Sequence, residues 1–269
     1  MENRTNNSKG ERIMESQKMT VAVCLSVLAF WANCSHGAID TDFSAGMQRN
    51  GTATAAPGSL RLASWGDTGS AFWWQKQDVS GGFTTEFSFT NGRSGSADGN
   101  YDTGFAFIIQ NQGIDALGSD GSGLGYDGIE KAVVIEFDHR SRPPAPFSFN
   151  HLAIQSGNTG LVSSDHNQAL GFSSFVQDLA FDHTARITYA DKNLKVWVDP
   201  ETWTEPWLDI NINISNSLSL DDGTAWVGFT GSSGRGYSVI RQWDYTEEVP
   251  EPATMLLLGL GGLILRKRK

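Results

Sequence analysis

Glu136 and Asp138 are the residues whose type and spacing most directly suggest chemistry in this sequence. They stand two positions apart in the largely apolar run Ala132-Val-Val-Ile-Glu-Phe-Asp138, which is typical of a strand. Because alternate side chains of a strand point to the same face, both carboxylates are predicted to project side by side. Two adjacent anions require a cation, a proton or a base. A metal site and an ion pair with Arg140 or Arg142 are therefore both possible.

Other arrangements typical of enzymes or of nucleic-acid-binding proteins are missing from the sequence. It contains no Ser-His-Asp order, Cys-His pair or His-x-x-His spacing. His166 and His183, with their neighbours Asp165 and Asp182, have the surroundings of surface loop residues. The formal net charge of −10 disfavours nucleic acid and anionic lipid as partners, because both are polyanions. We predict that the chain is not an enzyme and does not bind nucleic acid.

The elements that must position the two carboxylates are predicted to be strands. In 83–89, apolar residues and Thr85 alternate with polar residues, which indicates a half-solvated antiparallel strand. The segments 104–110 and 132–138 are apolar on both faces, as central strands are. Residues 185–189 and 194–198 flank the turn 190–193 as a hairpin, and further strands are expected at 224–230 and 238–246. No convincing helical stripe appears between 38 and 247, so the predicted fold is an all-β sandwich of two antiparallel sheets.

The first 37 residues are predicted to be an N-terminal extension and a secretory signal peptide. A basic residue, Lys18, precedes the apolar run 20–31, and small and polar residues follow up to an expected cleavage after Gly37, with Ala38 as the alternative. Both cysteines, Cys24 and Cys34, lie in this segment. The exported domain, 38–247, would therefore have no disulfide, and its stability must come from its core. Its length suits one sizeable β domain.

The C-terminal segment 248–269 resembles a PEP-CTERM sorting signal. It combines Pro-Glu-Pro, the apolar run 255–265 and a basic end, in the residues Pro250, Glu251, Pro252, Arg266, Lys267 and Arg268. The apolar run is shorter than the roughly 20 residues that cross a bilayer comfortably, and it is expected to form a short hydrophobic helix. The resemblance implies transient insertion in the inner membrane and cleavage by an exosortase, with the basic end on the cytoplasmic side.

The domain itself resembles the L-type, or legume-like, lectins. The resemblance rests on several motifs in order, among them Gly104-Phe-Ala-Phe-Ile-Ile-Gln-Asn111, Val133-Val-Ile-Glu-Phe-Asp138, Asn150-His-Leu-Ala-Ile154 and Ala225-Trp-Val-Gly-Phe-Thr-Gly231. It covers nearly the whole domain, and it implies a concanavalin A-like jelly-roll β-sandwich. The site still has to be judged residue by residue, because one fold carries many functions.

The resemblance implies a metal site that this chain retains only in part. Glu136 and Asp138 occupy the positions that begin the family's site for Ca²⁺ and a second divalent ion, and His151 occupies that of its metal-binding histidine. The loop between them has lost the family's side-chain ligands, and the missing aspartate falls near Pro146. Since Ca²⁺ takes six to eight oxygen ligands, the site is predicted to be degenerate. An occupied site and a carboxylate–arginine cluster both remain open.

The resemblance also implies a set of carbohydrate-binding residues. The family has an aspartate directly before the strand that here begins at Gly104; this chain has Thr103 there and Asp102 one position earlier. A glycine loop would present backbone amides to sugar hydroxyls, an aromatic ring would stack on the sugar, and a loop near the C-terminus would set specificity. The candidates are Asp102, Thr103, Gly121, Gly123, Phe149 (with Phe147 as the other possible ring), Ser232 and Ser233.

Glycoside hydrolases of the laminarinase type share this jelly roll, but their Glu-x-Asp-x-x-Glu strand is incomplete here, where Ser141 replaces the last acid. We therefore predict an exported carbohydrate-binding protein that is processed at its C-terminus. Its partner would be a polysaccharide or glycoconjugate, at the cell surface or in a biofilm matrix. The alternative is a structural or adhesive matrix protein that keeps the lectin scaffold without binding sugar.

Overall fold

The structure is a computed structural model that describes residues 42–93, 101–141, 150–174, 179–202 and 204–248. Contacts divide the chain into two units, 1–38 and 39–269, and all described residues belong to the second. The predicted signal peptide, the Pro-Glu-Pro tail and its expected short helix lie outside the described residues. Within the described part, no helix is long and apolar enough to span a bilayer.

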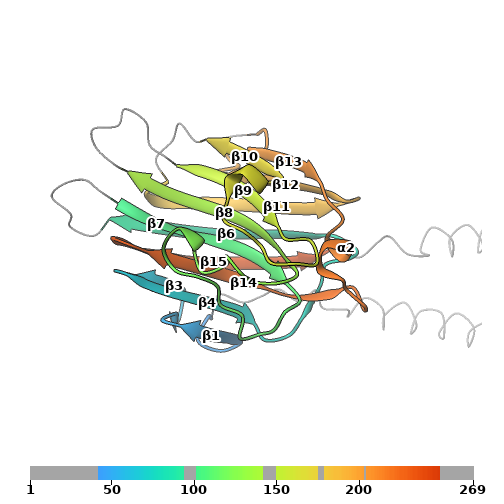
Figure 1. The fold of residues 1–269 in the computed structure, drawn as a ribbon. Helices are drawn as coiled ribbons and strands as arrows, with labels where there is room; N and C mark the ends of the chain where they lie inside the picture. Colours follow the sequence, from blue (N-terminus) through green and yellow to red (C-terminus); the bar gives the residue numbers. More distant parts are fainter. Residues whose placement is uncertain (1–41, 94–100, 142–149, 175–178, 203, 249–269) are drawn as a thin grey trace, which may run out of the picture. The chain divides into compact units, whose positions relative to one another are not determined.

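Two antiparallel sheets form the two layers of the domain (Figure 1). The eight-stranded sheet has the order β1-β4-β14-β7-β8-β9-β10, with β5 paired to β14. Its strands are β1 (Met47–Gly51), β4 (Asp67–Trp73), β5 (Gln77–Asp78), β7 (Tyr101–Gln110), β8 (Ala132–Ser141), β9 (His151–Ser156), β10 (Gly171–Ser174) and β14 (Thr224–Ser233). The seven-stranded sheet has the order β13-β12-β11-β6-β15-β3-β2. Its strands are β2 (Thr54–Ala56), β3 (Ser59–Ser64), β6 (Phe83–Arg93), β11 (Phe181–Ala190), β12 (Asn193–Val198), β13 (Leu208–Asn211) and β15 (Gly236–Glu247).

Aromatic side chains fill the space between the sheets. Phe87 of β6 meets the edge of Phe229 of β14, with ring centroids 5.0 Å apart, and Phe105 of β7 stacks on Phe137 of β8 at 4.8 Å. These contacts join strands of both sheets in one core. The strands predicted at 83–89, 104–110 and 132–138 are confirmed, and so is the all-β sandwich.

The predicted hairpin is also confirmed, and its turn is as short as a hairpin allows. Ala190 of β11 pairs with Asn193 of β12, so only Asp191 and Lys192 connect the strands. Both have positive φ, 51° and 63°, as a type I′ turn requires. The sequence pattern did not reveal the helix α2 (Ile214–Leu218) or the 3₁₀ turns η1 (Gly121–Gly123) and η2 (His166–Gln168). Segments this short are too brief to show a helical period.

The segment 111–131 covers the outer face of the eight-stranded sheet. Leu124, Tyr126 and Ile129 pack there against Ile108 and Val134 in a second apolar cluster. This layer explains why the segments 104–110 and 132–138 are apolar on both faces. It also carries the Tyr126 side chain to Glu136.

Candidate metal and carbohydrate site

Glu136 and Asp138 lie on the outer face of β8, as the strand pattern predicts. In the register of β8 and β9, Asp138 is opposite His151 and Glu136 is opposite Ala153. Because directly opposed residues share a face, His151 stands next to both carboxylates. The sequence predicted this group from a resemblance, and the sheet register supplies the physical reason for it.

A second histidine, His166, joins the group from the 3₁₀ turn η2. Asp165 caps this turn by accepting a hydrogen bond from the backbone N–H of Asn167 at 3.0 Å. The segment before it is tied to the covering layer: Val162 donates to the carbonyl of Ile129 at 2.9 Å, and Ser164 donates to Asp127 at 3.0 Å. The expected surface position of His166 is confirmed, since its side chain is 38% exposed, but the residue also contacts Glu136 and His151. For His183 the same expectation is wrong, because it lies on β11 and its side chain is 8% exposed.

The Glu136 carboxylate lies between the two imidazoles. Its Oε1 is 3.4 Å from Nε2 of His151, and its Oε2 is 3.2 Å from Nε2 of His166. The two Nε2 atoms are 3.0 Å apart. Glu136, His151 and His166 therefore form a compact set of three potential ligands, which we call the histidine–glutamate triad. Asp138 lies beside it, with Oδ2 3.9 Å from Nδ1 of His151.

Neighbouring side chains hold the triad in place. Tyr126 donates its hydroxyl to Oε2 of Glu136 at 2.9 Å. The ring of Phe172, on β10, stacks on His151 with centroids 5.1 Å apart and an angle of 29°, and it also contacts His166. No local sequence signal singles out Tyr126, His166 or Phe172, because they come from three separate segments that only the fold brings together.

Burial and hydrogen bonding act in opposite directions on Glu136, which is 1% exposed. Burial alone would raise its pKa, but hydrogen bonds and attraction from His151 and His166 outweigh it and leave the pKa below its ordinary value. Burial and the nearby Glu136 charge raise the pKa of Tyr126. Tyr126 therefore stays protonated and keeps donating to a carboxylate that stays ionised.

The candidate carbohydrate residues are only partly brought together. Ser232, on β14, accepts a hydrogen bond from the backbone N–H of Gly121 at 2.9 Å, so the glycine loop and the end of β14 meet. Thr103 places its hydroxyl 3.1 Å from that of Ser238. The side chains of Thr103, Ser232 and Ser233 are all buried. These residues hold strands and loops together, whereas a sugar would have to contact exposed groups.

The remaining candidates differ in what the structure describes. Gly121 is exposed and has φ +59°, whereas Gly123 is buried. The backbone of Asp102 pairs with that of Arg140 across β7 and β8. Phe149, Pro146 and Arg142 lie outside the described residues.

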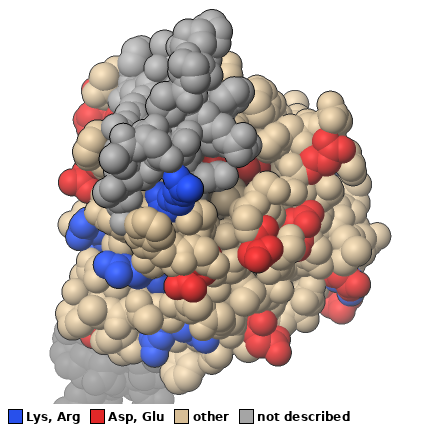
Figure 2. Space-filling model, turned by 60° about the vertical axis from the view of Figure 1, so that its left-hand side comes forward, with Lys and Arg blue, Asp and Glu red and all other residues tan. Residues whose placement is uncertain are grey.

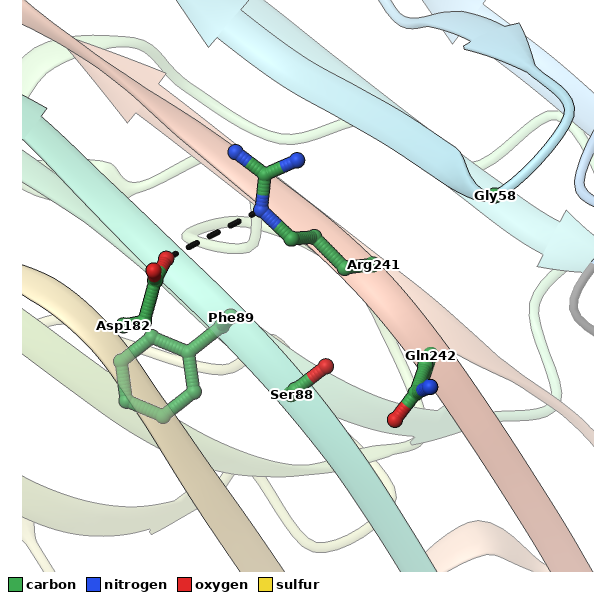
Figure 3. Close-up of a pocket in the computed structure, with 6 residues that line it drawn as sticks. All are labelled: Gly58, Ser88, Phe89, Asp182, Arg241 and Gln242. Atoms are coloured by element: carbon green, nitrogen blue, oxygen red, sulfur yellow. Dashed lines mark ion pairs between the residues drawn. The ribbon is translucent and has the colours of Figure 1, made fainter.

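A shallow hollow of about 460 Å³ lies on the seven-stranded sheet, on β6, β11 and β15 (Figure 3). Arg241 crosses it, with Nε 3.8 Å from Oδ1 of Asp182 and 3.0 Å from the hydroxyl of Thr90. Both charged side chains are largely exposed, so their attraction contributes little to stability. No member of the triad lines this hollow. The hollow holds one exposed ion pair, whereas the triad holds three potential metal ligands around a buried carboxylate. The triad is therefore the better candidate for a functional site.

The donors in the triad fit only one of the two metal ions that the resemblance implies, the second divalent ion and not Ca²⁺. Ca²⁺ takes six to eight oxygen ligands, whereas two of the three triad ligands are imidazole nitrogens. Residues 139–149 contain no Asp, Glu, Asn or Gln, so no carboxylate or amide side chain can come from that loop. Asn150, the next amide, has its oxygen 2.8 Å from Nδ1 of His139.

Comparison with known protein families gives two matches. The family model described as "Legume lectin domain" matches residues 42–256. The model of the PEP-CTERM protein-sorting motif matches residues 248–269, which include the Pro-Glu-Pro and the basic end. The first match covers the whole described part of the chain.

Comparison with individual proteins agrees with the family match. A protein of Arabidopsis thaliana described as "Probable L-type lectin-domain containing receptor kinase S.5" is 26% identical over 158 residues. The match covers 53% of this chain but only 23% of that protein. Winged bean acidic lectin, solved with methyl-α-D-galactose, superposes with a TM-score of 0.61 at 17% identity, covering 81% of this chain and 100% of the lectin. The exoplasmic/lumenal domain of VIP36, in a Ca²⁺/Man-bound form, reaches 0.57 at 13% identity, covering 76% and 84%. At these identities, the solved structures show a shared fold.

Proposed function

This chain belongs to the legume lectin domain family, and we propose that it is an exported protein that binds a polysaccharide or glycoconjugate. The observation that carries the proposal is the family match over residues 42–256, together with a jelly roll that superposes on sugar-binding lectins. The family consists of carbohydrate-binding proteins rather than enzymes, in agreement with the prediction from the sequence.

The surface charge is compatible with a neutral or basic glycan as partner. On the face shown in Figure 2, basic side chains occur in separate small groups among acidic and uncharged residues. With a formal net charge of −10, the chain would repel polyanions over most of its surface.

The proposed contact region lies where the glycine loop meets the end of β14. Gly121 and Ser232 are hydrogen-bonded there, and the start of β7 pairs with the end of β14 through Thr103 and Ser233. The resemblance assigns contacts with sugar hydroxyls to Asp102 and to the backbone amides of the glycine loop. Few polar groups converge on this region, so the affinity for a single sugar is expected to be weak.

A glycan array probed with the purified protein tests the proposal. Binding to a defined set of glycans is expected, and Asp102→Ala should abolish it. Asp221→Ala is the matched control, because Asp221 is an exposed aspartate on a distant turn. If the wild type binds no glycan, the scaffold-only alternative is favoured; this alternative already draws support from the burial of Thr103, Ser232 and Ser233.

The tail is proposed to direct export and processing. The matched sorting motif supports cleavage by an exosortase after transient membrane insertion, followed by release to the cell surface or matrix. Glu251→Ala, or deletion of 266–269, should leave the uncut chain in the membrane fraction of the host, as seen by immunoblot. Glu201→Ala, an exposed glutamate in the domain, should be processed normally. Normal processing of both tail variants would refute the sorting role.

A further inference from the structure

The spacing of the three triad ligands matches one edge length of a tetrahedral metal site. Their contacts are 3.0 Å between the two imidazole nitrogens, and 3.2 Å and 3.4 Å from these nitrogens to the carboxylate. Zinc binds histidine nitrogen at about 2.0–2.1 Å, which places neighbouring tetrahedral ligands about 3.3 Å apart. We propose that His166 supplies an additional ligand to the divalent transition-metal ion, such as Zn²⁺, that Glu136 and His151 would hold at the family's metal-binding positions.

Either a metal ion or a proton must lie between the two facing imidazole nitrogens. Both Nε2 atoms face the same space, and a carboxylate oxygen lies next to each. If both Nε2 atoms carry lone pairs, they repel at 3.0 Å unless a cation lies between them. A shared proton is the other way to satisfy this geometry, so the test must distinguish an ion from a proton.

The side chains around the triad hold its ligands in fixed orientations. Glu136 is buried, and its Oε2 is oriented by the Tyr126 hydroxyl at 2.9 Å. Hydrogen bonds from neighbouring side chains to metal ligands orient those ligands and tune their affinity for the metal. The Asp138 carboxylate lies 3.9 Å from Nδ1 of His151, on the side of the ring away from the triad. His166, whose side chain is 38% exposed, lies on the solvent side of the buried Glu136.

The donor set selects against calcium. Two imidazoles and one carboxylate are the ligand type of catalytic and open zinc sites, whereas calcium requires an oxygen cage. In this chain the ion would link β8, β9 and η2, and would therefore pin the segment before β10 to the sheet. This role does not depend on sugar binding.

Metal titration of the purified full-length protein tests the proposal directly. After chelator treatment, Zn²⁺ is titrated in competition with a chromophoric chelator, and Co²⁺ is added separately to read the coordination geometry from its visible spectrum. One equivalent of Zn²⁺ is expected to bind, with an intense tetrahedral-type Co²⁺ spectrum. Excess Ca²⁺ should not displace either ion, and Tm should rise with Zn²⁺ concentration.

His166→Ala should weaken Zn²⁺ binding by more than about 100-fold, which exceeds the loss expected when a group that only orients a metal ligand is removed. The matched control is Gln168→Ala, which changes an exposed residue of the same 3₁₀ turn and should leave the affinity unchanged. Because Cys24, Cys34 and His36 could also bind zinc, only the difference between these two variants is assigned to the triad. Far-UV circular dichroism checks that both variants fold.

Three results would overturn the proposal. Tight Ca²⁺ binding that His166→Ala leaves intact would indicate a calcium-type site. Zn²⁺ binding that is equal in both variants would indicate adventitious binding elsewhere. The absence of any divalent binding would leave a shared proton between the histidines. The readout here is metal affinity, whereas that of the proposed function is glycan binding, so the failure of one proposal is distinguishable from the failure of the other.

Discussion

At the scale of single residues, the site depends on one buried carboxylate and the groups that surround it. Glu136 accepts from Tyr126 and lies between His151 and His166. A buried carboxylate without such partners would be protonated or strongly destabilising. The partners therefore explain how a charged residue can occupy an apolar central strand.

Tyr126→Phe removes the hydroxyl that donates to Glu136. Loss of a hydrogen bond to a charged group is expected to lower the free energy of unfolding by about 1.5–3 kcal/mol. Zn²⁺ affinity should fall by about 10–100-fold, because the carboxylate is less well oriented. Urea denaturation and metal titration measure the two effects. Tyr189→Phe, whose hydroxyl donates to the carbonyl of Ile212, is the control and should leave metal affinity intact.

At the scale of elements, central strands buried on both faces carry the stability of the domain. β7 and β8 pack against the aromatic core on one side and against the segment 111–131 on the other. Since the described domain contains no cysteine, no disulfide supplements this packing.

Truncation of a core side chain on these strands should be costly. Phe107 and Ile135 are fully buried. Phe107→Ala and Ile135→Ala are each expected to destabilise the protein by about 2–5 kcal/mol through lost burial and the cavity left behind. Phe172→Ala is the control: its ring is 52% exposed, so the cost should be clearly smaller. Urea denaturation measures the free energy of unfolding of each variant. A decrease below about 0.5 kcal/mol at both core positions would contradict the placement of Phe107 and Ile135 on central strands.

The hairpin between β11 and β12 offers a stabilising change. Lys192 has φ +63°, a conformation that costs an ordinary residue about 1–2 kcal/mol and glycine almost nothing. Lys192→Gly should raise the free energy of unfolding by about 0.5–1 kcal/mol, after the extra chain entropy of glycine is subtracted. Lys195→Gly, in the middle of β12, should instead be destabilising. A loss of stability in Lys192→Gly would show that the turn is not type I′.

At the scale of the whole molecule, composition and burial together set the response to solution conditions. The chain has a formal net charge of −10 and a pI near 4.9, so it is strongly anionic at neutral pH. Three of its tyrosines, Tyr126, Tyr189 and Tyr245, have hydroxyls bonded inside the protein. Burial is the largest cause that raises the pKa of each.

These raised pKa values predict alkaline unfolding. A group whose pKa is higher in the folded state binds its proton more tightly there, so its contribution to stability is fully present below the unfolded pKa. That contribution is lost as pH rises from about 10, the ordinary tyrosine value, toward the folded pKa. Urea denaturation between about pH 8 and about pH 11 should show a plateau followed by a fall. Tyr245→Phe should make the fall shallower; unchanged stability up to about pH 11 would contradict the prediction.

The sequence by itself determined the properties that depend on local pattern. Alternation of Phe and polar residues predicted β6, apolar runs predicted β7 and β8, and the order of motifs predicted the jelly roll and the sorting tail. The pairing of Glu136 with Asp138 on one face followed from the period of a strand. In each case the information lies within a few neighbouring residues.

Only the tertiary structure decided which distant residues meet these carboxylates. His166 reaches Glu136 because hydrogen bonds tie the segment 162–164 to 127–129, and Tyr126 reaches it because the segment 111–131 covers the sheet. Likewise, the burial of Thr103 and Ser232 follows from their packing between strands that are far apart in the chain. Such contacts depend on long-range packing, which leaves no periodic signal in the sequence.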